Sequence, residues 1–271
     1  MKGLLNSWRI PLIAVGFLVV GIQGLIIGSI LIPLLRRVSD PEQVELRSQR
    51  LIQRGWRVLV RYLRWTGLVH VHVHGLENVR PGCMLVANHP TLIDTPVVVS
   101  MLPQVDCIIS PSYSHIFAIR RAIAGAGYLS SDQGLLLVET AAARLRRGRI
   151  LLIYPEGTRS PEVGAHPLHR GAAHIALRAG CDVVPVVLTA EPRTLVKGRA
   201  WYHAADRPIE YTIRVGEPIE PRPRIEPGES RARAAKRVTA QLQEVLGKGI
   251  GTLSAGPSGA REASQQSRRI I

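Results

Sequence analysis

The longest apolar stretch of the chain, Ile10–Leu35, constrains the fold more than any other feature of the sequence. At a rise of about 1.5 Å per helical residue, this run would extend about 39 Å, whereas the hydrocarbon core of a bilayer is roughly 30 Å thick. The run is too long for the apolar region of a cleaved signal peptide, and no small-residue cleavage site follows it. We therefore expect residues 1–37 to form a transmembrane or re-entrant hydrophobic segment. Gly24 and Gly28 would suit a helix contact or a bend in it, although unrelated glycines would look the same.

Arginines are more frequent after the apolar run than before it. Lys2 and Arg9 precede the run, whereas Arg36, Arg37 and further arginines follow it. Positive residues flanking a span favour the cytoplasmic side. The sequence therefore predicts a protein of the inner (cytoplasmic) membrane whose larger part faces the cytoplasm.

The next segment, residues 38–66, is predicted to form a basic amphipathic helix that ends near Trp65. Asp40 suits the N-cap, Pro41 the first helical position and Gln43 the capping-box position. Arginines recur along one side of this helix at steps of three and four: Arg47, Arg50, Arg54, Arg57, Arg61 and Arg64. Such a helix can lie in the interface of an anionic membrane surface. The helix can also pack on the globular part of the chain and expose its charged side to solvent, and both arrangements can hold at once.

Short apolar runs alternate with amphipathic segments through residues 67–229. The runs that predict strands are Leu68–Val73, Cys83–Ala87, Cys107–Ser110, Ile150–Tyr154, Val183–Leu188 and Tyr211–Val215, and the helical patterns are Gly134–Arg147 and Leu168–Ala179. This order predicts an α/β fold, a mixed and mainly parallel sheet covered by helices, with an N-terminal membrane-associated helical segment. Residues 230–247 are predicted to form a C-terminal helix, and residues 248–271 a disordered basic tail.

The charge of the chain is strongly positive, with a formal net charge of +15 and a pI near 10.9. Almost all of this charge comes from arginine, which binds phosphate and carboxylate groups in a bidentate manner, so acidic or phosphorylated partners are expected. Nucleic acid is not an expected partner, because zinc-finger spacing and aromatic RNA-stacking motifs are absent and aromatic residues make up 4% of the chain. The three cysteines lie among apolar residues and are expected to be buried thiols.

The first candidate for chemistry is the sequence Asn-His-Pro-Thr-Leu-Ile-Asp, which directly follows a predicted strand and contains His89 and Asp94. An imidazole can accept a hydroxyl proton near neutral pH, and a buried carboxylate can fix its tautomer and stabilise the imidazolium. Taken alone, a histidine and an aspartate at this spacing are more often structural than catalytic.

The second candidate is Tyr-Pro-Glu-Gly-Thr-Arg-Ser at residues 154–160, at the end of another predicted strand. Gly157 would let the backbone approach a substrate, and Arg159 would offer a bidentate donor for phosphate. Glu156 would orient that arginine or accept a hydrogen bond from an acceptor hydroxyl. The alternative is a turn that carries a surface ion pair.

The two motifs together, in this order and behind a hydrophobic N-terminus, closely resemble the glycerolipid acyltransferase family, which includes lysophosphatidic acid acyltransferase. The resemblance covers roughly Val71–Pro218. It implies an O-acyltransferase of phospholipid biosynthesis whose catalytic domain spans residues 67–229, with His89 as general base, Asp94 as its partner, and acceptor-binding residues Glu156, Gly157, Thr158 and Arg159. It also implies acyl-CoA or acyl carrier protein as the donor and a lysolipid as the acceptor, with no cofactor and no metal. Val184-Pro185-Val186 matches a later apolar element of the family, usually assigned to acyl-chain or donor contacts.

One departure from the family concerns the middle motif. Members specific for lysophosphatidic acid usually carry an arginine there, whereas residues 127–133 of this chain contain none. Arg120 and Arg121 lie just upstream and are the candidates to replace it. The departure admits an alternative acceptor without glycerol, such as a lyso-ornithine lipid or a specialised metabolite.

The sequence admits two further interpretations, a metal site and an inactive protein. His70, His72 and His74 alternate along one predicted strand, a spacing that suits a transition metal, but three histidines on the polar side of an edge strand are the favoured reading. An inactive protein that kept the scaffold would be expected to have lost at least one residue of the two motifs, which are intact.

Overall fold

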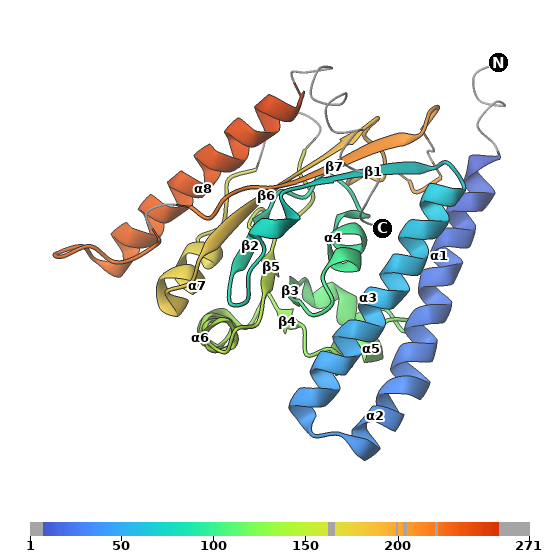
Figure 1. The fold of residues 1–271 in the computed structure, drawn as a ribbon, viewed down its shortest axis with the longest axis horizontal. Helices are drawn as coiled ribbons and strands as arrows, with labels where there is room; N and C mark the ends of the chain where they lie inside the picture. The colour runs from blue at the N-terminus through green and yellow to red at the C-terminus, as the bar shows by residue number, and fades with distance from the viewer. Residues whose placement is uncertain (1–7, 162–165, 199, 203–204, 220–221, 255–271) are drawn as a thin grey trace.

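A seven-stranded sheet lies at the centre of the protein, between two layers of helices (Figure 1). The computed structural model describes residues 8–161, 166–198, 200–202, 205–219 and 222–254. The strands are β1 (Val69–His74), β2 (Met84–Ala87), β3 (Asp106–Ile109), β4 (Leu129–Ser130), β5 (Leu151–Ile153), β6 (Val183–Glu191) and β7 (Ile209–Val215). Their order across the sheet is β1-β7-β6-β2-β5-β3-β4.

The sheet is mixed and mainly parallel, as the sequence predicted. Every neighbouring pair runs parallel except β6 and β7, which pair antiparallel. The central strands β2 and β5 are buried on both faces, which explains why they read as continuous apolar runs rather than alternating ones. Because β2 and β5 are parallel neighbours, the loops that follow them emerge at the same edge of the sheet.

One face of the sheet is covered by α6 (Gly134–Arg146), α7 (Gly171–Ala179) and α8 (Arg231–Ser254), as Figure 1 shows. Alanines 172, 173 and 176 of α7 are almost fully buried, so this helix approaches the sheet closely. The last helix is longer than expected. It continues through residues 248–254, which were predicted to belong to the disordered tail, because Ile250 and Leu253 pack against the same apolar cluster. The remainder of the predicted tail, residues 255–271, lies outside the described residues.

The other face is covered by α4 (Asp94–Met101) and α3 (Pro41–Trp65), with α5 (Arg120–Gly125) beside them. Asp40 caps α3 by accepting a hydrogen bond from the Gln43 amide at 2.9 Å, as the sequence predicted. The apolar side of α3 packs on α1 and α4, and Ile52 and Leu59 are buried there.

The arginines of the predicted basic stripe on α3 are all exposed. The structure shows the apolar side of this helix packed on α1 and α4, and the lie of its basic side against an anionic membrane surface stays a prediction. A buried cluster of charges fixes the helix in place. Asp106 of β3 accepts hydrogen bonds from Gln49, Arg144 and Arg149, and both arginines also contact Glu45.

The N-terminal apolar segment forms one continuous helix, Arg9–Val38, which is long and apolar enough to cross a membrane. It consists of α1 (Arg9–Ile26), a π-helical turn (Ile27–Leu31) and α2 (Ile32–Val38), and it packs antiparallel to α3 (Figure 1). A side chain at Gly24 would meet the Ala118 carbonyl at 2.5 Å, and one at Gly28 would meet the Ala122 amide at 2.8 Å. The two glycines therefore mark a close helix contact, one of the alternatives drawn from the sequence.

Candidate active site

The two sequence motifs meet at one edge of the sheet. Asn88 and His89 follow β2, and Tyr154 and Glu156 follow its parallel neighbour β5. Asn88 fixes the end of β2, because its side-chain amide donates to the Leu188 carbonyl at 2.8 Å and accepts from the Leu188 amide at 2.7 Å. This reciprocal pair locks the loop that carries His89 onto β6.

His89 and Asp94 form a dyad. The Nδ1 atom of His89 lies 2.6 Å from Oδ2 of Asp94. Asp94 is fully buried at the first turn of α4, where the helix dipole favours its negative charge. Because Nδ1 is held by the carboxylate, Nε2 is the ring nitrogen left for a substrate.

Three further donors hold the Asp94 carboxylate. Oδ2 accepts from the Thr91 amide at 2.8 Å, and Oδ1 accepts from the hydroxyls of Thr91 and Tyr211. Burial raises the pKa of Tyr211 well above its ordinary value, and the negative charge of Asp94 adds to this effect. Tyr211 therefore stays protonated and remains a donor to the carboxylate. It lies on β7, 117 residues after Asp94, and no local pattern in the sequence links the two.

The ring of Tyr154 supports the imidazole from one side. The two rings stack with centroids 4.3 Å apart and an interplanar angle of 22°. Burial, reinforced by the charge of Asp94, raises the pKa of Tyr154 well above its ordinary value, so it stays a neutral phenol. The stack and the Asp94 hydrogen bond together restrict His89 to one orientation.

Glu156 holds the backbone of the His89 loop and does not line the cavity described below, although a substrate contact was expected of it. Its Oε1 accepts from the His89 amide at 3.0 Å and from the Ser160 hydroxyl at 2.6 Å, while the Ser160 amide donates to the His89 carbonyl at 2.7 Å. Glu156 is only 4% exposed. Its carboxylate therefore ties the second motif to the first, a role that the sequence did not reveal.

The other residues of the second motif do reach the cavity: Gly157, Thr158 and Arg159 all line it. Gly157 has a positive φ of 65°, and a side chain there would meet the His169 ring at 3.0 Å. Arg159 donates from Nη1 to the Leu195 carbonyl at 2.7 Å, in the loop between β6 and β7.

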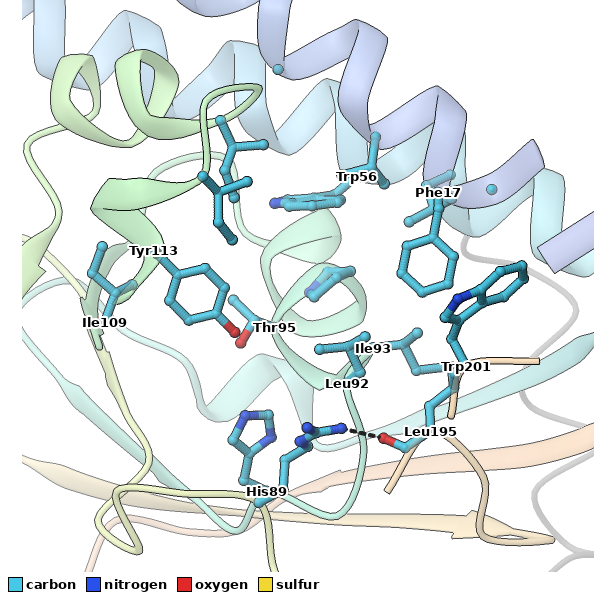
Figure 2. A pocket seen from close by; sticks show the side chains of 18 of the residues that line it. Phe17, Trp56, His89, Leu92, Ile93, Thr95, Ile109, Tyr113, Leu195 and Trp201 are labelled. Atoms are coloured by element: carbon cyan, nitrogen blue, oxygen red, sulfur yellow. Dashed lines mark hydrogen bonds between the residues drawn. The ribbon is translucent and has the colours of Figure 1, made fainter. Parts of the chain in front are cut away.

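His89 opens into a cavity of about 960 Å³ (Figure 2). The cavity reaches from His89 and Thr95 to α1 and α3, where Phe17 and Trp56 line it. Most of its lining is apolar, and Trp201 closes one side by stacking edge-on against Phe17 with centroids 5.7 Å apart. The site thus joins a candidate general base to an apolar chamber at the top of the usual range for small-molecule pockets, about 300–1,000 Å³.

The part of the chain that carries this site is similar to a known protein family. The model of the Acyltransferase family matches residues 70–189, which include both motifs. The chain is therefore similar to this family over residues 70–189. The matched segment begins within β1 and ends within β6.

Curated relatives of this chain carry 1-acyl-sn-glycerol-3-phosphate acyltransferase names. The one from Pseudomonas aeruginosa is 25% identical over 62% of this chain and 66% of its own length. The one from Cocos nucifera is 25% identical over 59% of this chain and 53% of its own length. The chain spans about half the length of the first curated relatives that it matches.

The fold has a solved counterpart in the 1-acyl-sn-glycerophosphate (LPA) acyltransferase PlsC of Thermotoga maritima. The TM-score is 0.70 at 20% sequence identity, and the match covers 93% of this chain and all of the other. This counterpart supports the fold described above, including the helices that precede β1.

Two sets of residues singled out in the sequence lie away from this cavity. Arg120 and Arg121 are at the start of α5 and do not line it; Arg120 lies over the Phe117 ring, and Arg121 donates to the Ser29 hydroxyl at 3.3 Å. His70 and His72 lie on β1, an edge strand, and each bonds one oxygen of Glu210 at 2.8 Å. These histidines therefore form an exposed hydrogen-bonded group on the polar side of the edge strand.

Proposed function

We propose that this protein is a membrane-bound acyltransferase that transfers a fatty acyl group from acyl-CoA or acyl carrier protein to a hydroxyl of a lysophospholipid such as 1-acyl-glycerol-3-phosphate. The observation that carries the proposal is the His89–Asp94 dyad at the opening of a large apolar cavity. The dyad supplies a base, and the cavity offers space for fatty chains. The names of the curated relatives support the same acceptor class.

In the proposed reaction, Nε2 of His89 removes the proton from the acceptor hydroxyl while Asp94 stabilises the imidazolium that forms. The acceptor oxygen then attacks the thioester carbonyl, which gives a tetrahedral oxyanion. When this intermediate collapses, the carbon–sulfur bond breaks, the new ester remains, and the imidazolium returns its proton to the thiolate. No acyl-enzyme is formed, so the chain needs one base and one set of positioning contacts.

The long N-terminal helix supports a membrane location. Its outward side carries exposed apolar residues, among them Leu18, Ile22, Ile30 and Leu34. The arginine excess after the helix supports an inner-membrane protein whose catalytic domain faces the cytoplasm. Because α1 also lines the cavity, a lysolipid in the membrane and the catalytic dyad would lie on two sides of the same chamber.

The test is mass spectrometry of lipids formed by the detergent-purified protein. Palmitoyl-CoA or palmitoyl-acyl carrier protein is supplied with a panel of acceptors: 1-acyl-glycerol-3-phosphate, other lysophospholipids, lyso-ornithine lipid and 1-acylglycerol. His89→Ala is the inactive variant, and His70→Ala is its matched control, because His70 is exposed on β1 and does not line the cavity.

We expect a diacyl product with the wild type and with His70→Ala, and none with His89→Ala. A product with lyso-ornithine lipid alone would replace the glycerol phosphate acceptor. Absence of any product from folded protein, or an unchanged yield with His89→Ala, would reject the proposed reaction.

A further inference from the structure

The charges that line the cavity are unusually one-sided. The lining residues in the described part of the chain include the cations Arg9, Arg159 and Lys197 and no aspartate or glutamate. An unbalanced set of cations beside an apolar chamber favours an anionic ligand, because like-signed groups at a concave site raise the local concentration of the opposite charge. The cavity is therefore expected to favour a ligand that combines an apolar chain with a negative charge.

Arg159 and Lys197 are connected through the chain around Leu195. The Leu195 carbonyl accepts both from Arg159 at 2.7 Å and from the amide of Leu92, in the loop that carries His89 (Figure 2). Lys197 follows Leu195 by two residues, so the two Cα atoms are at most about 7 Å apart. Arg9, by contrast, donates to the Ala205 carbonyl and starts α1, about 12 Å along the helix from Phe17.

Both cations keep donors for a ligand. Arg159 donates one N–H to the Leu195 carbonyl, and within the described residues its other guanidinium donors make no hydrogen bond. Lys197 has neither an ion pair nor a hydrogen bond among those residues. Lys197 of the β6–β7 loop and Arg159 of the second motif therefore line the same cavity as His89, each with donors that no described residue accepts.

We propose that Lys197 adds a second cation to the phosphate-binding role that the sequence resemblance implies for Arg159, and that Lys197 makes the protein selective for lysolipids with a phosphate close to the acceptor hydroxyl. This inference rests on the proposed function and names the residue that sets the acceptor class. Arg159 binds phosphate in a planar, bidentate manner, and Lys197 adds a point charge from the opposite segment. In this way, a lysine of a distant loop supplies the second cation that Arg120 and Arg121 were expected to provide.

The kinetic test compares Lys197→Gln, Lys197→Arg and the control Lys236→Gln, which changes an exposed lysine of α8 on the far side of the sheet. Each variant acylates 1-oleoyl-glycerol-3-phosphate or 1-oleoylglycerol in non-ionic detergent micelles, so that membrane surface charge does not contribute. For Lys197→Gln, we expect KM for the phosphate acceptor to rise about tenfold, equivalent to about 1.4 kcal/mol, with kcat within threefold and KM for 1-oleoylglycerol unchanged. Lys197→Arg should restore most of the difference, and Lys236→Gln should match the wild type.

A second measurement does not depend on activity. Trp56 and Trp201 line the cavity, so tryptophan fluorescence reports binding of either lipid without an acyl donor. Weaker binding of the phosphate lipid alone by Lys197→Gln would support the site even if no transfer were detected, and such absence of transfer would count against the proposed function only. Equal affinity of the wild type and Lys197→Gln for the phosphate lipid, or an equal loss for both lipids, would overturn the inference.

Discussion

Replacing Asp94 by asparagine separates the charge of the dyad from its geometry. Each carboxylate oxygen accepts two hydrogen bonds: Oδ2 from the Thr91 amide and His89, and Oδ1 from the hydroxyls of Thr91 and Tyr211. An asparagine can keep its oxygen at the Oδ2 position and turn its NH₂ toward the two hydroxyls, which can also accept. The variant should therefore fold and keep the His89 tautomer, while the negative charge is lost.

The expected loss follows from the attraction between the imidazolium and the carboxylate. For charges about 4 Å apart at an effective dielectric constant of about 20, this attraction is about 4 kcal/mol. Because the imidazolium exists only once the acceptor proton has moved, the loss falls on the transition state, and kcat should drop about 10³-fold.

The assay is the initial rate of diacyl lipid formation by Asp94→Asn, with thermal unfolding measured on the same preparation. We expect a midpoint within a few degrees of the wild type and a KM changed less than threefold. Asp94→Ala serves as a contrast, because it leaves four donors without their acceptor and should lower the unfolding midpoint as well. A folded Asp94→Asn variant that retained more than a third of wild-type kcat would refute the role given to the carboxylate charge.

Three further predictions concern the surrounding structure. Gly157→Ala should lower the free energy of unfolding by about 1–2 kcal/mol and reduce activity, because φ is 65° and the new methyl group would lie 3.0 Å from the His169 ring; denaturant titration and initial rates check this. Gly28→Val should lower the unfolding midpoint in detergent without a specific effect on kcat, because its side chain would meet the Ala122 amide; an unchanged midpoint would contradict the contact with α5. Cys107 and Cys181 should resist iodoacetamide at pH 8 in the native protein and react after unfolding, because burial raises the pKa of each thiol to about 12; rapid labelling of folded protein, read by mass spectrometry, would count against this.

The sheet and the position of the dyad were accessible from the sequence because they depend on local patterns. Buried strands such as β2 and β5 are short apolar runs, and α3 opens with a capping pattern at Asp40 that the structure confirms. Helix α4 was missed because it begins inside the first motif. Pro96 and the run of valines also have low helix propensity, so the segment did not look helical. Helix α5 was missed for its length, since it has only six residues.

The contacts that complete the site could not be foreseen, because they join residues far apart in the chain. Tyr211 reaches Asp94 from β7, and Leu195 meets Arg159 from a loop with no regular structure. Glu156 looked like a surface or substrate-facing carboxylate, and only the parallel pairing of β2 with β5 brings it to the His89 amide. Residue type and spacing therefore predicted the pairing of His89 with Asp94, whereas the supporting groups depended on the tertiary fold.

The N-terminal helix, which was predicted to be a transmembrane or re-entrant segment, also lines the candidate active-site cavity. Ile13, Phe17, Val20 and Gly24 of α1 face the cavity that His89 opens into. Deleting residues 1–37 to obtain a detergent-free protein would leave the two motifs intact. It would also remove one side of the cavity that His89 lines. We therefore expect that the shortest form of the protein with a complete cavity includes its most hydrophobic segment. A more soluble variant would need polar substitutions on the outward side of that helix, not its deletion.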